Sequence, residues 1–140
     1  MSKTMGSKGL VWHTMTDLRI HDSAPVIKAY SRCDEVFHAF FFGPDVFKEG
    51  NGGVWGMMSG VKLSPLRLRF LCECLQSVDS ALRETKADRG LQVVRSSARD
   101  ALPQLTKELG VKTVYCHSAY GTDEDTVLDA TTERLREIGV

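Results

Sequence analysis

The chain alternates short apolar runs with longer segments of helical periodicity, and this alternation constrains the fold more than any single motif. Four runs rich in apolar and β-favouring residues predict strands at residues 9–14, 35–42, 91–95 and 111–117. Helices are predicted at residues 25–31, from residue 64 onward, between residues 97 and 110, and from residue 122 to about residue 138. Strand–helix alternation is typical of a parallel sheet with right-handed crossovers. We therefore expect a single α/β domain.

Local signals mark the predicted helix ends. Asp22 and Ser23 precede the first helix as candidate caps, Ser64-Pro65 opens the longest helix, and Ser97 and Gly110 bracket the next. The longest helix carries an apolar stripe at steps of three and four residues: Leu68, Leu71, Leu75, Val78 and Leu82. Residues 48–62 contain five glycines and predict an irregular loop. Residues 1–8 predict a disordered tail, so the domain is expected to span residues 9–140.

Composition narrows the possible functions. Eighteen basic and 18 acidic residues give a formal net charge of zero, which argues against direct binding to nucleic acid. No segment is long and apolar enough to predict a membrane span. The four cysteines and four histidines show no metal-binding spacing, so the cysteines predict packed, reduced thiols in a soluble protein of a reducing intracellular compartment. No turn carries a dinucleotide-binding or P-loop motif, which leaves a hydrolase or nucleotide-binding enzyme the weakest alternative.

Six segments follow one another in an order found in a known family. They are residues 11–22 (Val-Trp-His-Thr-Met-Thr-Asp-Leu-Arg-Ile-His-Asp), 40–44 (Phe-Phe-Phe-Gly-Pro), 67–75 (Arg-Leu-Arg-Phe-Leu-Cys-Glu-Cys-Leu), 93–95, 102–105 and 114–117. In this order they resemble the N-terminal domain of DNA photolyases and cryptochromes, with the DASH or plant-type branch most similar. The resemblance covers about residues 9–140.

The resemblance implies a Rossmann-like domain with strand order 3-2-1-4-5 that holds an antenna pigment. The fifth strand is expected to be missing, because Val140 falls before it. In the family the pigment passes excitation energy to FAD in a separate helical domain. We therefore expect light harvesting for photoreception or DNA repair only together with an FAD domain, and no catalytic residue in this chain. The alternative is a non-catalytic module that acts through protein contacts, including self-association through an open sheet edge.

Six residues are candidates for contact with the pigment. Glu124, with Asp123 beside it, matches the position of a carboxylate that folate-binding members use, and a carboxylate can accept paired N–H bonds from a pterin ring. The other four lie at or near the ends of predicted strands: Trp12, His13, Phe42 and His117. Methenyltetrahydrofolate is the expected pigment. Ala119 and Gly121 stand where deazaflavin-binding members have acids, which argues against deazaflavin.

Several of these residues also have a structural interpretation. Glu124 is more typical of a solvated acid in the first turn of a helix, where it meets the positive end of the helix dipole, than of a pigment contact. His117 is likewise more typical of a hydrogen-bonded histidine at a strand end, and Asp17 with Arg19 indicates an ion pair within the domain or a cap. His13 belongs to an altered first turn, in which His-Thr-Met-Thr replaces the family's Phe-Arg.

Overall fold

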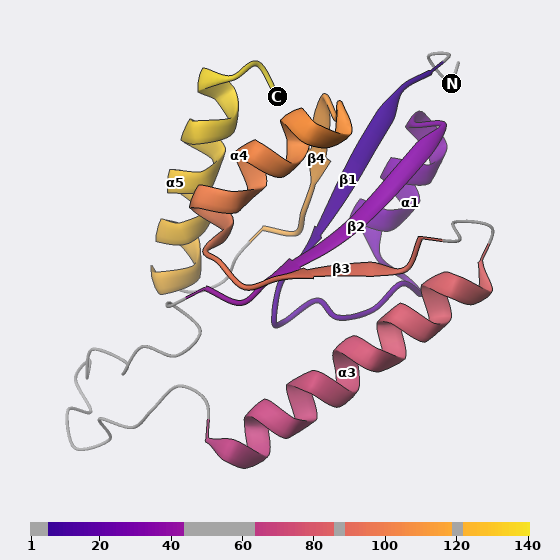
Figure 1. The fold of residues 1–140 in the computed structure, drawn as a ribbon, viewed down its shortest axis with the longest axis vertical. Coiled ribbons are helices and arrows are strands. Elements are labelled where there is room, and N and C mark those ends of the chain that lie inside the picture. The colour runs from indigo at the N-terminus through magenta and orange to yellow at the C-terminus, as the bar shows by residue number, and fades with distance from the viewer. Residues whose placement is uncertain (1–5, 44–63, 86–88, 119–121) are drawn as a thin grey trace.

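Four parallel strands form one sheet in a computed structural model of the chain, which describes residues 6–43, 64–85, 89–118 and 122–140, the side chains of 122–125 excepted. The strands are β1 (Lys8–His13), β2 (Glu35–Phe41), β3 (Leu91–Val94) and β4 (Thr113–Tyr115). Their order across the sheet is β3-β2-β1-β4 (Figure 1). The predicted α/β class and the order 3-2-1-4 are confirmed, and the described ranges contain no fifth strand.

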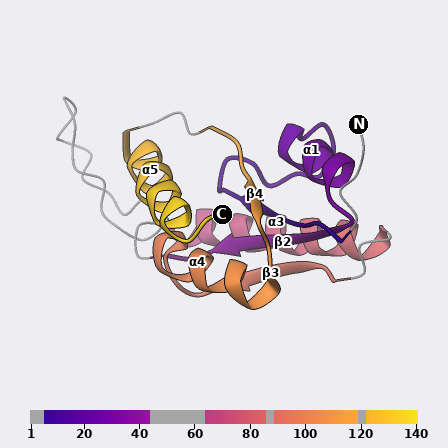
Figure 2. The same ribbon diagram turned by 90° about the horizontal axis from the view of Figure 1, so that it is seen from above.

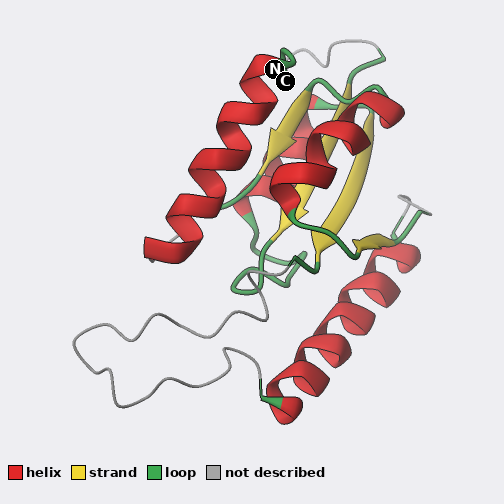
Figure 3. Cartoon of the chain, turned by 60° about the vertical axis from the view of Figure 1, so that its left-hand side comes forward, coloured by secondary structure: helices red, strands yellow, loops and turns green. Residues whose placement is uncertain are grey.

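Helices lie on both sides of this sheet (Figure 3). They are α1 (Ala24–Arg32), α3 (Pro65–Glu84), α4 (Ala98–Leu109) and α5 (Thr122–Glu137). Helix α1 joins β1 to β2, α4 joins β3 to β4, and α5 follows β4. The predicted loop at residues 48–62 falls outside the described residues. None of the described helices has the length and apolar character that a membrane crossing requires.

Strand register decides which side chains face which helices. Leu10 and Trp12 of β1 pack with Phe41 of β2, and with Leu102 of α4 and Leu135 of α5, in one core cluster. Alternate residues along a strand point to opposite faces, so the intervening residues of β1 and β2 face α1 and α3 instead. Figure 2 shows α1 on one side of β2 and α4 on the other. The result is a three-layer domain with a core on each face of the sheet.

The aromatic run of β2 fills both cores. Phe40 is 2% exposed and Phe41 is 6% exposed, while Phe42, just beyond the strand, is only partly buried. Because successive strand residues alternate in direction, Phe40 packs against the α3 side and Phe41 against the α4 side. Two of these three rings are therefore core residues.

Helix α3 is buried along the predicted stripe only in part. Leu71, Leu75, Val78 and Leu82 pack against Phe40 and Leu91, but the first turn of the helix does not reach the sheet. Leu66 and Phe70 are accordingly exposed, by 79% and 68%. In Figure 1, α3 lies beside β3 at its C-terminal end and diverges from the sheet toward its N-terminal end.

The local end signals were correct for α4, and for α1 they gave the correct cap position and first-turn proline but not a side-chain capping bond. The Ser97 hydroxyl accepts a hydrogen bond from the Asp100 N–H at 3.3 Å, and Gly110 ends the helix with a left-handed φ of 68°. Ser23 occupies the cap position of α1, but its side chain makes no capping bond. Asp22 beside it has a positive φ of 52°, and the Ser23 hydroxyl is buried without a hydrogen-bond partner among the described residues. The turn geometry therefore directs that hydroxyl into the interior instead of toward the helix N–H groups.

Strand boundaries differ by one to two residues from those predicted at residues 9–14, 91–95 and 111–117. Strand β1 begins at Lys8, and the Ser7 carbonyl accepts from the Asp34 N–H at 2.9 Å, so ordered structure starts before residue 9. Strand β4 has only three residues, because its pairing with β1 ends at Val11↔Tyr115. Among the described residues β4 pairs with β1 alone, which leaves its other edge open there.

Candidate functional site at the carboxyl edge of the sheet

The carboxyl ends of the four strands meet at one edge of the domain. In open α/β sheets this edge is where ligands bind, especially where the strand order reverses. Here the order reverses between β1 and β4, since α1 and α4 lie on opposite faces. Two features occur at this edge: an open groove after β2 and β3, and a charged cluster between β1 and β4.

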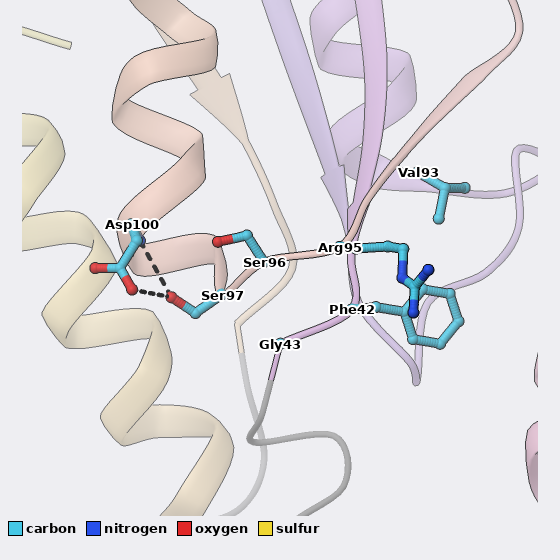
Figure 4. A pocket seen from close by; sticks show the side chains of 7 residues that line it. All are labelled: Phe42, Gly43, Val93, Arg95, Ser96, Ser97 and Asp100. Atoms are coloured by element: carbon cyan, nitrogen blue, oxygen red, sulfur yellow. Dashed lines mark hydrogen bonds between the residues drawn. The ribbon is translucent and has the colours of Figure 1, made fainter.

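The groove has a cavity volume of about 700 Å³ and is lined by residues at the carboxyl ends of β2 and β3 and at the start of α4 (Figure 4). Phe42 forms an aromatic wall of the groove. Two contacts hold it in place: its N–H donates to the Val94 carbonyl at 2.8 Å, and its ring packs edge-on against Phe40 with centroids 5.0 Å apart. The described residues that line it are Phe42, Gly43, Val93, Arg95, Ser96, Ser97 and Asp100. A volume of this size is in the range of small-molecule sites.

The polar groups of the groove differ in whether they are already engaged. The Ser97 hydroxyl donates to Asp100 Oδ2 at 2.7 Å and also caps α4, so both groups are occupied (Figure 4). Within the described part of the chain, the exposed Arg95 guanidinium has no carboxylate partner and the Ser96 hydroxyl makes no hydrogen bond. A ligand with an acidic group therefore finds a cation and a hydroxyl available beside an aromatic ring.

Asp17 organises the cluster between β1 and β4. Its side chain is only 6% exposed, and it lies in the turn after β1 that is closed by the Asp17 N–H bond to the Thr14 carbonyl. Oδ1 is 3.5 Å from Arg19 Nε, and Oδ2 is 3.3 Å from His117 Nε2. Oδ2 and Nε2 are both buried, and neither meets hydrogen-bond geometry. The expected ion pair of Asp17 with Arg19 is confirmed, and His117 joins it.

A second polar arrangement runs beneath this edge, through the α1 side of the sheet. His13 Nδ1 is 3.1 Å from the Asp17 carbonyl oxygen, His13 Nε2 is 2.9 Å from His38 Nδ1, and His38 Nε2 is 3.1 Å from the Tyr30 hydroxyl. His13 is fully buried and His38 is 2% exposed. Burial, reinforced by the neighbouring His13, lowers the pKa of His38 to about 3. Burial also lowers the pKa of His13, although the carbonyl and carboxylate of Asp17 oppose this effect.

The structure places the six predicted site residues in different surroundings. Phe42 lines the groove. His117 and His13 both meet Asp17, the first through its carboxylate and the second through its carbonyl. Trp12 is 7% exposed in the core on the α4 side, edge-on to Phe41. Asp123 and Glu124 belong to the first turn of α5, and their side chains fall outside the described part of the structure.

Sequence reasoning missed Arg95 and Ser96, although a signal for them exists. Arg95 is the last residue of the strand predicted at residues 91–95 and Ser96 follows it, so the rule that was applied to His117 at the end of its strand also finds them. The His13–His38 contact has no such signal, because it depends on strand register: Val11 pairs with His38, which places His38 and His13 on the same face. The described residues contain no cluster of three or more metal-ligating side chains, and all four cysteines are free.

Comparison with known proteins identifies the domain. The family model described as DNA photolyase matches residues 9–140. Cryptochrome DASH of Gloeobacter violaceus is 30% identical over 115 residues, covering 82% of this chain and 21% of that protein. The chloroplastic/mitochondrial cryptochrome DASH of Arabidopsis thaliana is 30% identical over 125 residues, covering 88% of this chain and 20% of the relative. The chain therefore spans about a fifth of the length of the curated relatives it matches.

Solved structures of the same family share the fold. The Synechocystis cryptochrome superposes with a TM-score of 0.70 at 23% identity, over 99% of this chain and 27% of that chain. The class III photolyase of Agrobacterium tumefaciens gives a TM-score of 0.67 at 19% identity, over 99% of this chain and 25% of that chain. Because the family model matches residues 9–140, nearly the whole chain, the chain belongs to the DNA photolyase family and corresponds to the N-terminal α/β domain of its members.

Proposed function

We propose that this chain is an antenna domain that binds a folate-type pigment at the carboxyl edge of its sheet. The observation that carries the proposal is the groove after β2 and β3, where an aromatic ring, a cation and a hydroxyl line one cavity of about 700 Å³, and where the cation has no carboxylate partner and the hydroxyl no hydrogen bond among the described residues. When bound, methenyltetrahydrofolate supplies near-ultraviolet absorption. Light harvesting then requires an FAD-bearing domain to accept the excitation energy, which we propose as the partner.

The residues of the groove match the parts of a folate. The Phe42 ring offers an apolar face for a flat heterocycle, and its packing against Phe40 holds it in place. Arg95 is suited to a glutamate carboxylate, because a guanidinium donates two parallel N–H bonds to a carboxylate. Ser96 adds a hydroxyl beside it. The first turn of α5, with Asp123 and Glu124, follows β4 at the same end of the sheet (Figure 1). We therefore propose Glu124 as the acceptor for pterin N–H groups.

We test the proposal by titrating the purified chain with methenyltetrahydrofolate. The near-ultraviolet absorbance and fluorescence of the pigment report binding. We expect saturable binding to one site, weakened at least tenfold by Phe42→Ala and by Arg95→Gln. A tenfold loss corresponds to about 1.4 kcal/mol, which is modest for a charge-assisted bond. Glu124→Gln tests the contribution of α5.

The matched control is Arg136→Gln, which removes an equal charge from an exposed position in the last turn of α5. It should leave binding unchanged. Binding that falls equally in Arg95→Gln and Arg136→Gln indicates general charge attraction and refutes the groove. An absence of saturable binding up to about 100 µM, equivalent to less than about 5.5 kcal/mol, refutes the antenna function of this chain.

A second proposal is that the domain acts through protein contacts. One observation favours it: in the described structure β4 pairs only with β1, and an open strand edge can add a strand from another chain. Sedimentation velocity over a range of concentrations tests this proposal. We expect a dimer that Thr113→Lys dissociates, because a lysine on an exposed edge strand disfavours added pairing. A monomer at every concentration contradicts it.

A further inference from the structure

Three hydrogen bonds connect the surface of α1 to the turn after β1. They run from the Tyr30 hydroxyl to His38 Nε2, from His38 Nδ1 to His13 Nε2, and from His13 Nδ1 to the Asp17 carbonyl oxygen. The series crosses α1, β2 and β1 in turn, and Tyr30 is 38% exposed while both imidazoles are buried. We call these three residues the histidine latch: Tyr30, His38 and His13.

The Asp17 carbonyl oxygen, at the inner end of the latch, determines which nitrogen of each imidazole carries a proton. A main-chain carbonyl can only accept, so His13 Nδ1 carries a proton and donates to the Asp17 carbonyl oxygen. A neutral His13 then has a bare Nε2, which must accept from His38 Nδ1–H. A neutral His38 has a bare Nε2 in turn, which accepts from the Tyr30 hydroxyl. All three contacts are thus satisfied when both imidazoles are neutral Nδ1–H tautomers.

With protons assigned in this way, the latch cannot conduct a proton from one end to the other. Its inner end is a carbonyl that cannot pass a proton on, so the series stops at Asp17. What it does instead is hold the turn at residues 14–17 against β2 and α1. That turn carries Asp17, whose carboxylate lies beside Arg19 and His117 at the crevice between β1 and β4.

Acid acts against this arrangement in two ways. A first proton placed on His38 Nε2 reverses the bond with Tyr30 and puts a charge in a position that is 2% exposed. A second proton must go to His13 Nε2, where it faces the His38 Nδ1–H across 2.9 Å, so two donors oppose each other. Solvent-exposed imidazoles accept protons without either cost.

Charged groups around the latch do little to relieve the cost. The Asp17 carboxylate attracts a proton to His13, but Asp17 already lies beside Arg19 and His117, and His117 opposes protonation of His13. Helix α3 presents Asp79 and Arg83, which are paired with each other at 2.8 Å. The charged side chains of α1 are exposed at its surface: Lys28 and Arg32.

We infer that Tyr30, His38 and His13 form an acid-sensitive latch, closed when both imidazoles are neutral, whose opening frees α1 and the turn that carries Asp17. A released histidine has an ordinary pKa near 6.5. Lowering the pH from 7 to 5 therefore raises the ratio of open to closed form by about 25-fold for one released histidine, and by about 600-fold for two.

Amide hydrogen exchange on the 140-residue chain, corrected for the intrinsic effect of pH, measures this opening. We expect protection in α1 and in residues 14–17 to fall between pH 7 and pH 5, while protection in α4 is kept. His38→Asn supplies an N–H donor at the position of Nδ1 without a titratable group. The change in opening between pH 7 and pH 5 should therefore fall from about 600-fold to about 25-fold. The matched control is His21→Asn, which removes an exposed histidine outside the latch and should change nothing.

Two outcomes overturn the inference. One is a pH response that is the same in His38→Asn and in the unaltered chain. The other is loss of protection in α4 together with α1, since that indicates unfolding of the whole domain. Should His38→Asn fail to fold, nitrogen NMR of the unaltered chain at pH 7 still decides: both buried imidazoles must be neutral Nδ1–H tautomers, and an Nε2–H tautomer at either refutes the latch.

Discussion

Gly90 controls how α3 is attached to the sheet, and replacing it with alanine tests that attachment. Gly90 has a φ of 63°, a conformation that an L side chain adopts only with strain. A Cβ atom added there would overlap Asp79 Oδ1 and lie 2.9 Å from Arg83 Cζ. Asp79 Oδ1 accepts from the Leu91 N–H at 2.7 Å, and Oδ2 accepts from Arg83 Nε at 2.8 Å. Gly90→Ala therefore disturbs the bond that joins α3 to β3.

The cost has two separable parts. The left-handed backbone costs an alanine about 1–2 kcal/mol. Displacing the Asp79 carboxylate loses a charge-assisted hydrogen bond of about 1.5–3 kcal/mol and an exposed ion pair of about 0.3–0.5 kcal/mol. We expect Gly90→Ala to lower the free energy of unfolding by about 3–5 kcal/mol, a large fraction of the stability of a domain this size.

Gly110→Ala is the matched control for Gly90→Ala. Gly110 has a φ of 68°, and a Cβ added there meets nothing within 4 Å, so only the backbone part of about 1–2 kcal/mol applies. Urea unfolding followed by circular dichroism gives both values. In an Asp79→Ala background the cost of Gly90→Ala should fall to that of Gly110→Ala. Equal costs for the two glycines in the unaltered chain would show that Asp79 does not tie α3 to β3.

Three smaller predictions test the core, the cap and the thiols. Leu102→Ala should destabilise the domain by about 2–5 kcal/mol in urea unfolding, because Leu102 is fully buried; Leu66→Ala, at a position 79% exposed, should change stability by less than about 0.5 kcal/mol. Ser97→Ala should cost about 1 kcal/mol through loss of the α4 cap, and an unchanged midpoint would contradict the capping bond. Burial raises the pKa of Cys116 above its ordinary value of 9.0, so its alkylation rate should keep rising above pH 9; a rate that levels off below pH 9 contradicts the burial.

Local sequence signals were sufficient for most of the fold. Helix α4 has a serine cap, an apolar stripe and a terminal glycine, and each acts within a few residues of the chain, so its bounds follow from sequence. The same type of signal failed at Ser23, because the positive φ of Asp22 redirects the hydroxyl. The length of β4 also could not be read locally, since it is set by where its pairing with β1 ends.

The candidate site was predictable only where chain order alone determines position. Phe42 and His117 follow strands, so a parallel sheet brings them to the same edge whatever the register. The contact between His13 and His38 depends on register, because a slip of one residue would send one imidazole to the opposite face. Trp12 and His13 are adjacent in sequence and alternate in direction, and for this reason they lie in different cores.

The measurement that tests the central claim most directly is NMR mapping of methenyltetrahydrofolate on the isotope-labelled chain. If the pigment occupies the groove after β2 and β3, the amide shifts of Gly43, Ser96 and Ser97 should move together and saturate with a single dissociation constant. The amides of Gly90 and Gly110, at the opposite ends of β3 and α4, should stay in place. Saturable shifts confined to another surface, or no shifts at all, would contradict the proposal that this edge of the sheet is an antenna site.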